Sequence, residues 1–302
     1  MEVAVMALTF REILSWCEEN HKEFWEYMLY DDMHIREVSA EESMHKMDAA
    51  FQVMCDTIAT YSKDRLSRSG LVGAEGSRLE DYRGLELSKL NALGIKPPMC
   101  GDYMGDAMIV ALKMAESNAC MRRIVAAPTA GACGVVPAVL IPYYERNMGS
   151  REEIVKALYV AGAIGQVISE RASISGAKGG CQAEIGSAAA MAAGALAYLQ
   201  GGDAQTICHS VALTIKGILG LVCDPVAGLV EVPCVKRNVM GAVHAISCAD
   251  MAMAGIRSVI PPDEVIDAMA EVGEKMDPSL KETALGGLAA TDTARKLEES
   301  LL

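Results

Sequence analysis

Three glycine-rich, apolar segments are the places in this sequence where residue types and spacing could support chemistry: residues 127–137, 173–186 and 220–238. Each joins a turn that glycine permits to the expected start of a helix, where free backbone N–H groups can hold an anion such as a carboxylate. Four of the ten cysteines lie inside these segments, namely Cys133, Cys181, Cys223 and Cys234. Cysteines gathered in loop-like interior segments indicate metal binding.

The spacing of these cysteines is not diagnostic by itself. Cys181, Cys223 and Cys234 are separated by 42 and 11 residues, which matches no local zinc or ferredoxin motif, and the chain has no CxxC pair. On spacing alone, metal binding and simple burial are equally open for these three, and no role is assigned to Cys133. The other cysteines lie in segments with a helical pattern and are expected to pack as small apolar side chains: Cys17, Cys55, Cys100, Cys120, Cys208 and Cys248.

Polar residues in the same segments could bind a substrate carboxylate. Candidate hydrogen-bond donors are Thr129, Gly131, Ser173 and Ser175, and helix capping is an equal alternative for each. Arg237 could clamp a carboxylate with two hydrogen bonds, but a structural ion pair with Glu231 or Asp224 is favoured.

Lysine and histidine give weaker candidates. Lys178 could form a Schiff base, but no tetraglycine phosphate loop accompanies it, so this role is set aside. Three histidines lie in the charged N-terminal helices and are expected at the surface: His21, His34 and His45. His209 and His244 lie in apolar segments, where a hydrogen-bonded core residue is favoured over a base.

Together with residues 282–291, the glycine-rich segments resemble the α chain of the iron-sulfur-dependent L-serine dehydratases. The resemblance rests on long strings that include Gly-Gly-Cys-Gln, Cys-Asp-Pro-Val and Val-Pro-Cys-Val, and it is dense over residues 126–291. It implies an all-helical catalytic domain in which Cys181, Cys223 and Cys234 hold a four-iron four-sulfur (4Fe-4S) cluster. Three ligands leave one iron open, and as a Lewis acid that iron would bind the hydroxyl of L-serine and promote loss of water, giving pyruvate and ammonia.

The chain departs from single-chain members of that family in two ways. Those members end in a cysteine that can occupy the open iron, whereas this chain has no cysteine after Cys248, so the iron should be free for substrate. They also carry a further domain with a Ser-Ser-His-Thr-Ala-Gly motif, which is absent here. The resemblance therefore implies a separate β chain, a hetero-oligomer, and a general base that could come from that partner.

Two alternative functions stay open at this point. A cysteine desulfidase would use the same cluster chemistry, and nothing in the sequence separates a hydroxyl from a thiol leaving group. A non-catalytic zinc subunit would use Cys208, His209, His244 and Cys248, although ordinary zinc spacing is missing.

The composition excludes several classes of protein. Of 302 residues, 51% are hydrophobic and only 5% aromatic, which excludes a disordered or collagen-like chain. A net charge of −13 argues against nucleic-acid binding, which needs a positive surface. Two uncharged runs, residues 124–144 and 185–202, are rich in proline, alanine or glycine, so buried helices are favoured over membrane spans. The absence of an export signal after Met1 indicates a reducing, cytoplasmic setting.

The elements that must position the glycine-rich segments are expected to be helices. Strand-like alternation is scarce, and no glycine-rich dinucleotide motif follows an apolar strand, so the fold class is all-α, a multi-helix domain with glycine-rich turns around the buried site. One catalytic domain is expected over residues 1–302, with an N-terminal helical segment at 1–70 and a cluster-binding core at 100–291. Residues 161–250 carry few charges and should form the interior.

Capping patterns predict where helices begin. Thr9 and Ser39 are each followed three positions later by Glu and should start two long N-terminal helices. Residues 67–84 are predicted to be a loop, and residues 102–123 a helix. Further helix starts are expected at Ser150, Asp203 and Pro262.

Overall fold

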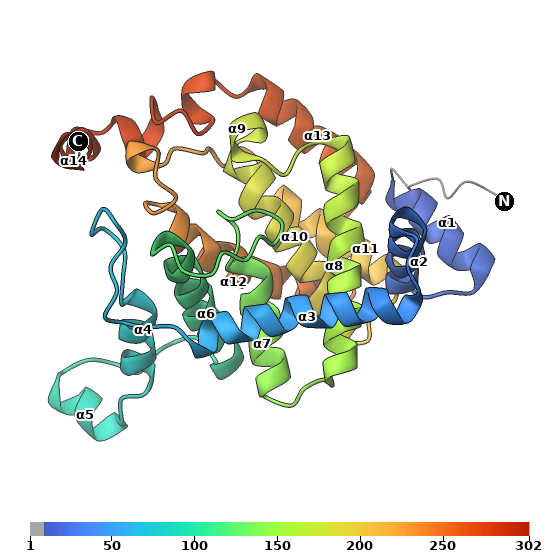
Figure 1. Cartoon of the computed structure of the whole chain (residues 1–302), viewed down its shortest axis with the longest axis horizontal. Coiled ribbons are helices and arrows are strands. Elements are labelled where there is room, and N and C mark those ends of the chain that lie inside the picture. The colour runs from blue at the N-terminus through green and yellow to red at the C-terminus, as the bar shows by residue number, and fades with distance from the viewer. Residues whose placement is uncertain (1–8, 302) are drawn as a thin grey trace.

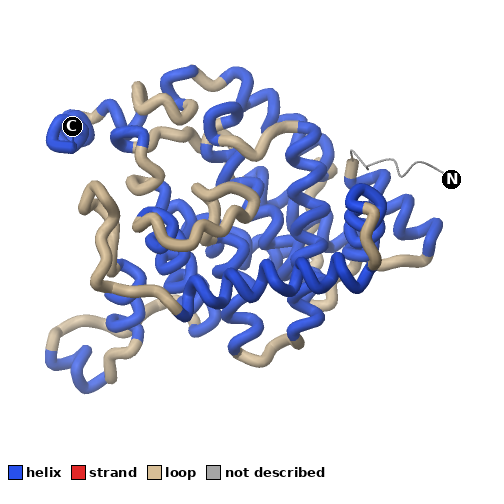
Figure 2. The backbone as a smooth tube through the Cα atoms, viewed as in Figure 1, coloured by secondary structure: helices blue, strands red, loops and turns tan. Residues whose placement is uncertain are grey.

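The computed structural model describes residues 9–301, and these form α-helices joined by turns (Figure 2). Within that range there is no β-strand, and the only strand-like pairing is an isolated parallel bridge between Cys223 and Lys281. The predicted all-α class is confirmed. None of the described helices is long and apolar enough to cross a membrane.

Fourteen α-helices and three short 3-10 helices make up the described part of the chain. In chain order they are α1 (Phe10–Asn20), α2 (Phe24–Arg36), α3 (Ala40–Ala59), α4 (Glu75–Arg83), α5 (Leu87–Ala92), α6 (Asp102–Ala119), α7 (Val135–Glu145), α8 (Arg151–Arg171), α9 (Gly176–Gly179), α10 (Cys181–Leu199), α11 (Ala204–Lys216), η1 (Val226–Gly228), α12 (Cys234–Met253), α13 (Pro262–Lys275), η2 (Pro278–Leu280), η3 (Gly287–Ala290) and α14 (Asp292–Leu301).

Helix α10 lies near the centre of the molecule and packs against α7, α8, α11 and α12 (Figure 1). Alanine is its most frequent residue, and the side chains of residues 188–193 are buried. Gly194 meets Ile164 of α8 so closely that even a methyl group would collide. Small residues therefore let the surrounding helices approach, which explains how a large core forms from a chain with few aromatic rings. The expected buried helix in residues 185–202 is confirmed.

The N-terminal segment contains three helices, so the prediction of two long ones is wrong. The caps at Thr9 and Ser39 are confirmed, because each side chain accepts a backbone N–H three residues later. The first predicted helix is interrupted at His21, which has a left-handed backbone (φ 53°). A new helix then begins after Glu23, whose N–H donates to the Glu26 side chain at 2.9 Å. Side-chain capping at this second start was missed.

The predicted loop at residues 67–84 is also wrong in part, because α4 occupies its second half. This helix has no side-chain cap of its own. Instead, the buried carboxylate of Glu116 in α6 accepts the N–H groups of Glu75 (2.6 Å) and Gly76 (3.3 Å). A carboxylate at a helix start accepts hydrogen bonds from the free N–H groups and interacts favourably with the positive end of the helix dipole. Because this cap comes from another element, the local sequence does not reveal it.

The later boundaries follow the sequence more closely. Ser150 caps α8, Asp203 caps α11 through the Thr206 N–H (2.8 Å), and Pro262 opens α13, as predicted. The helix expected at residues 102–123 ends earlier, at Ala119. In the uncharged run at 124–144, only the part from Val135 onward is helical, because residues 124–134 form turns.

Candidate active site

The three cysteines expected to bind metal lie at the starts of helices or next to them. Cys181 is the first residue of α10, Cys234 is the first residue of α12, and Cys223 lies in the segment between α11 and η1. Their exposed fractions are 2%, 7% and 3%. Burial of three sulfurs from separate elements makes this region the natural candidate for chemistry.

Arg237 connects the three cysteine-bearing segments. It lies one helical turn after Cys234 and donates to the carbonyl of Val222 at 2.9 Å. It also lies near Cys181, where its charge opposes the rise that burial causes in the pKa of that thiol. Its other partner is the buried carboxylate of Asp224, at 2.7 Å. The structural ion pair favoured from the sequence is therefore present with Asp224.

The other acid considered for Arg237 has different partners. Glu231 accepts hydrogen bonds from the hydroxyls of Ser67 (2.7 Å) and Ser69. Glu231 is thus a buried structural acid that ties the segment before α4 to the segment before α12. Only Asp224 pairs with Arg237 within the described residues.

Backbone contacts bring the segment between α13 and α14 to Cys223. Its N–H donates to Leu280 (2.8 Å), and its carbonyl accepts from Glu282 (2.7 Å). The Asp224 side chain accepts the N–H of Leu288 at 2.7 Å. The segment between α13 and α14 therefore closes one side of the site, which gives the string at residues 282–291 a structural role.

The approach to Cys181 depends on glycine at two positions. Gly180 has φ 76° and ψ 179°, a region that is essentially restricted to glycine. At Gly176 in α9, an added Cβ would lie 2.8 Å from the Cys223 sulfur. The turn before α10 therefore comes as close to the cysteines as the backbone allows.

The electrostatics of the site disfavour three free thiolates. Burial raises the pKa of Cys181 to about 11 and that of Cys234 to about 12. Burial also raises the pKa of Cys223, and the charges of Cys181 and Cys234 add to the effect. Three buried thiolates need a positive centre, and the starts of α10 and α12 supply only partial positive charge. The donor set thus fits a metal group that neutralises it.

The cysteines are not arranged for a single ion. Among residues 9–301, no three His, Cys, Asp or Glu side chains are grouped as ligands of one metal ion. The fit of these cysteines to a metal group therefore rests on their residue type, their burial and their electrostatic coupling to one another.

Thr129 and Gly131 lie at this site but contact a residue of the chain itself. The Thr129 hydroxyl donates to Oε1 of Glu184 at 2.6 Å, and Gly131 packs directly against the same carboxylate. Burial raises the pKa of Glu184, the Thr129 hydrogen bond opposes this, and the charge of Glu282 adds to the rise. Both residues were considered as substrate contacts, whereas in this structure both contact Glu184.

Asn238 fixes the turn that carries these residues. This fully buried amide donates to the carbonyls of Gly131 (2.8 Å) and Cys234 (3.0 Å). Its oxygen accepts the N–H of Gly134 at 2.8 Å. The turn before α7 and the first turn of α12 are therefore joined by one side chain.

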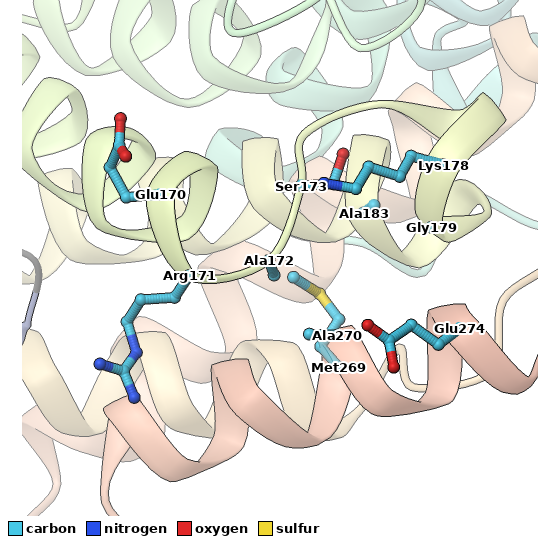
Figure 3. Close-up of a pocket in the computed structure, with 10 residues that line it drawn as sticks. All are labelled: Glu170, Arg171, Ala172, Ser173, Lys178, Gly179, Ala183, Met269, Ala270 and Glu274. Carbon is cyan, nitrogen blue, oxygen red and sulfur yellow. The ribbon is translucent and has the colours of Figure 1, made fainter.

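Ser173, Ser175 and Lys178 lie on the segment that leads to α10. The Ser173 hydroxyl accepts the N–H of Ser175 at 3.0 Å, as in a local turn cap. Ser173 and Lys178 line a small pocket whose other wall includes Glu274 of α13 (Figure 3). None of the three cysteines lines this pocket. These residues are thus near the site in sequence, but none of their described contacts is with Cys181, Cys223 or Cys234.

Most of the remaining cysteines and histidines follow the expectation, with two exceptions. His209 was expected to be a hydrogen-bonded core residue, but its Nδ1 atom is buried without a hydrogen-bond partner in the described chain. Cys100 is exposed, so its predicted burial is wrong, because it lies in the turn before α6. His244 contacts the Thr214 carbonyl (2.9 Å) and Cys248 (3.7 Å). His21, His34 and His45 are exposed as expected.

The zinc set proposed from the sequence is not assembled in the described chain. Cys208 and His209 line a cleft beside α1 and the start of α13, whereas the contacts of His244 are with α11 and its own helix. Cys133, for which no role was assigned, is buried and donates weakly to the Met114 carbonyl at 3.9 Å. Its position is that of a packing residue.

Sequence reasoning missed two residues that organise the site, Glu184 and Asn238. Glu184 is one of the few charges in the low-charge stretch and lies three residues after Cys181. A charge in an apolar interior is costly unless it is paired or functional, and that signal could have identified it. Asn238 had no comparable signal, because its partners are distant in sequence.

Comparison with known proteins covers the part of the chain that contains this site. The sequence model of the family described as serine dehydratase alpha chain matches residues 17–289. The chain is 43% identical over 293 residues to the probable L-serine dehydratase, alpha chain, of Bacillus subtilis (strain 168), covering 96% of this chain and 94% of that protein. It is 38% identical over 298 residues to the L-serine dehydratase, alpha chain, of Peptoniphilus asaccharolyticus, covering 98% and 99%.

A longer relative shows the same likeness. The L-serine dehydratase of Mycobacterium bovis (strain ATCC BAA-935 / AF2122/97) is 38% identical over 295 residues, covering 95% of this chain but 62% of that protein. From the family match and from relatives that align over nearly their whole length, the chain belongs to the serine dehydratase alpha chain family.

Proposed function

We propose that this chain is the α chain of an L-serine ammonia-lyase, which eliminates water from L-serine to give pyruvate and ammonia. The observation that supports it most is the convergence of three buried cysteines around Arg237 in a chain of this family. Its relatives carry the name L-serine dehydratase, some of them with the words alpha chain.

We also propose that Cys181, Cys223 and Cys234 hold a 4Fe-4S cluster. When bound, the cluster supplies a Lewis acid that draws electrons from the hydroxyl of the substrate. The raised thiol pKa values support this assignment, because a positive metal group would stabilise the thiolates that burial disfavours.

The chain's own residues would bind and shield the substrate. The starts of α10 and α12 present backbone N–H groups suited to a carboxylate. Thr129, Gly131, Ser173 and Ser175 stay candidates for substrate contacts, although the first two already meet Glu184. Arg237 would support Cys181 and Asp224 rather than bind substrate, because its hydrogen bonds are to the Val222 carbonyl and the Asp224 carboxylate.

A separate β chain would complete the enzyme as a hetero-oligomer. This chain spans 62% of the Mycobacterium bovis relative but nearly all of relatives named alpha chain, which supports a division into two chains. All ten cysteines are free, which fits a reducing compartment such as the cytoplasm.

The decisive experiment is to co-express the chain with its partner, purify both without oxygen, and assay pyruvate from L-serine. We expect iron and sulfide in near-equal amounts, a broad visible absorbance, and activity that needs the cluster. Full activity in iron-free protein would disprove the cluster proposal. A higher rate with L-cysteine than with L-serine would favour the desulfidase alternative, and zinc without sulfide would favour a metal-binding subunit.

A further inference from the structure

Glu184 is a carboxylate in the site that no cation neutralises. Among residues 9–301 it forms no ion pair, and its only hydrogen bond is the one that Oε1 accepts from Thr129. No hydrogen bond to Oε2 is present in the described chain. The cation closest to the cysteines, Arg237, is already engaged by Asp224.

The structural acids of this protein look different. Glu116 is 1% exposed and accepts hydrogen bonds from Glu75, Gly76 and Tyr61, so both of its oxygens are satisfied. Glu231 is 5% exposed and receives two serine hydroxyls. Glu184 receives one donor, fewer than Glu116 or Glu231. Asp31 of α2, which is 2% exposed, also receives one donor, from Gln166 at 3.1 Å, so the single donor distinguishes Glu184 only together with its position near the cysteines.

Glu184 lies close enough to the three cysteines for its charge to act on them. Its charge raises the pKa of Cys181, Cys223 and Cys234, after the larger effect of burial. The other titratable groups coupled to it are Glu282, from the segment before η3, and Cys133, from the turn before α7. A carboxylate whose pKa is raised by burial is suited to accept a proton near neutral pH.

The surrounding turn holds this carboxylate in one position. Thr129 binds one oxygen, and Gly131 leaves the room that the group occupies, since an added Cβ would lie 2.6 Å from Oε1 and 2.8 Å from Oε2. Asn238 in turn fixes the carbonyl of Gly131. Two contacts from the turn before α7 therefore orient Glu184, and Asn238 of α12 holds that turn, as expected for the support of a group that reacts.

We propose that Glu184 is the general base that removes the α-proton of L-serine, and that Thr129 and Gly131 are its positioning residues. This inference rests on the proposed function. It places the base within this chain rather than on the β chain.

The step balances as an elimination. The Glu184 carboxylate takes the proton from Cα, the electron pair of the broken C–H bond forms the Cα=Cβ double bond, and the Cβ–O bond breaks with its electron pair on the leaving oxygen. The leaving hydroxide takes up one proton from solvent and becomes water, and Glu184 releases its proton to solvent, which restores the carboxylate. The aminoacrylate product then tautomerises to an imine, and water hydrolyses it to pyruvate and ammonia.

The test compares Glu184→Gln with Glu271→Gln, in the α chain purified with its partner without oxygen. The Glu271→Gln substitution makes the same chemical change at a surface residue that pairs with Lys275 and is far from the cysteines in the sequence. Pyruvate formation is expressed per bound iron, so that loss of the cluster does not count as loss of catalysis. We expect Glu184→Gln to lose about 10²–10⁴-fold in kcat per iron with little change in KM, while its visible absorbance stays normal. Glu271→Gln should match the wild type.

Two further variants separate catalysis from support. Glu184→Asp should recover part of kcat and show a larger α-deuterium isotope effect, because proton removal becomes slower. Thr129→Val removes a donor that lowers the pKa of Glu184, so the acidic limb of the kcat profile should move to higher pH, and Thr129→Ser should restore it.

The outcomes distinguish the two proposals. If the wild-type complex makes no pyruvate from L-serine, the proposed function is wrong and this inference falls with it. If the wild type is active and Glu184→Gln keeps more than a third of kcat per iron, only the base assignment is overturned. If Glu184→Gln does not fold, an unchanged isotope effect in Glu184→Asp overturns it, and an increased effect supports it.

Discussion

Replacing Asn238 should test how the turn before α7 is held against α12. The Asn238 side chain is fully buried and makes three hydrogen bonds, to the N–H of Gly134 and to the carbonyls of Gly131 and Cys234. In Asn238→Ala, the Cys234 carbonyl still lies in the first turn of α12, where the helix offers another donor. The groups at Gly131 and Gly134 lose their partner.

The expected cost follows from those two groups. A buried polar backbone group without a partner costs about 1–3 kcal/mol, so the free energy of unfolding should fall by about 2–6 kcal/mol. That is a large part of the roughly 5–15 kcal/mol that stabilises a typical domain. Asn238→Asp keeps an acceptor for Gly134 but loses both donated bonds, so we expect it to be no better than alanine.

Urea unfolding followed by circular dichroism measures the change. The matched control is Asn20→Ala, because Asn20 is an exposed amide with one hydrogen bond, to the Trp16 carbonyl at 2.8 Å. We expect that control to change the free energy by less than about 1 kcal/mol. An Asn238→Ala protein as stable as Asn20→Ala would refute the view that this side chain holds the two segments together.

Three other outcomes are expected. Alanine at Cys181, Cys223 or Cys234 should reduce bound iron, measured by inductively coupled plasma analysis, to less than a third of the wild-type content. Cys100→Ala should not reduce it, because Cys100 is exposed in a turn outside the site. Equal iron in all four variants would show that the ligand assignment is wrong. Gly180→Ala should lower the free energy of unfolding by about 1–3 kcal/mol, because the backbone conformation of Gly180 is nearly restricted to glycine and an added Cβ would lie 2.6 Å from Met276. An unchanged melting temperature would contradict this prediction. In the metal-free chain, iodoacetamide at pH 8 should label the exposed Cys100 well before Cys181 and Cys234, because burial raises the pKa of those two thiols to about 11 and about 12. Raising the pH toward those values should speed the labelling of Cys181 and Cys234. Equally fast labelling of all three thiols at pH 8 would argue against the buried site.

The helical class and many helix starts could be predicted because they depend on short-range patterns. Ser39, Ser150 and Asp203 cap their helices through side chains that contact residues three positions away. The errors occur where a helical pattern of apolar residues continues across a residue that ends the helix. The pattern from Phe10 onward continues past His21, but the left-handed residue and the capping at Glu23 divide it.

The candidate site was predicted in part. Its cysteines could be selected because they lie in long, unusual strings that resemble one family, and the family match agrees with that resemblance. The partners of Thr129 and Gly131 could not be predicted, because Glu184 is 55 residues from Thr129 in the chain. A substrate contact and a contact with a protein carboxylate need the same donor, and only position distinguishes them.

By itself, the sequence determined the all-helical class, the apolar interior rich in small residues, and the segments that carry the cysteines, because composition and short-range capping are local properties. Tertiary structure alone decided that Glu116 caps α4, that Arg237 pairs with Asp224 and that Glu184 lies unneutralised beside the cysteines. The physical reason is that each of these groups is polar and at least partly buried, so its state depends on which distant segment supplies its hydrogen-bond partner.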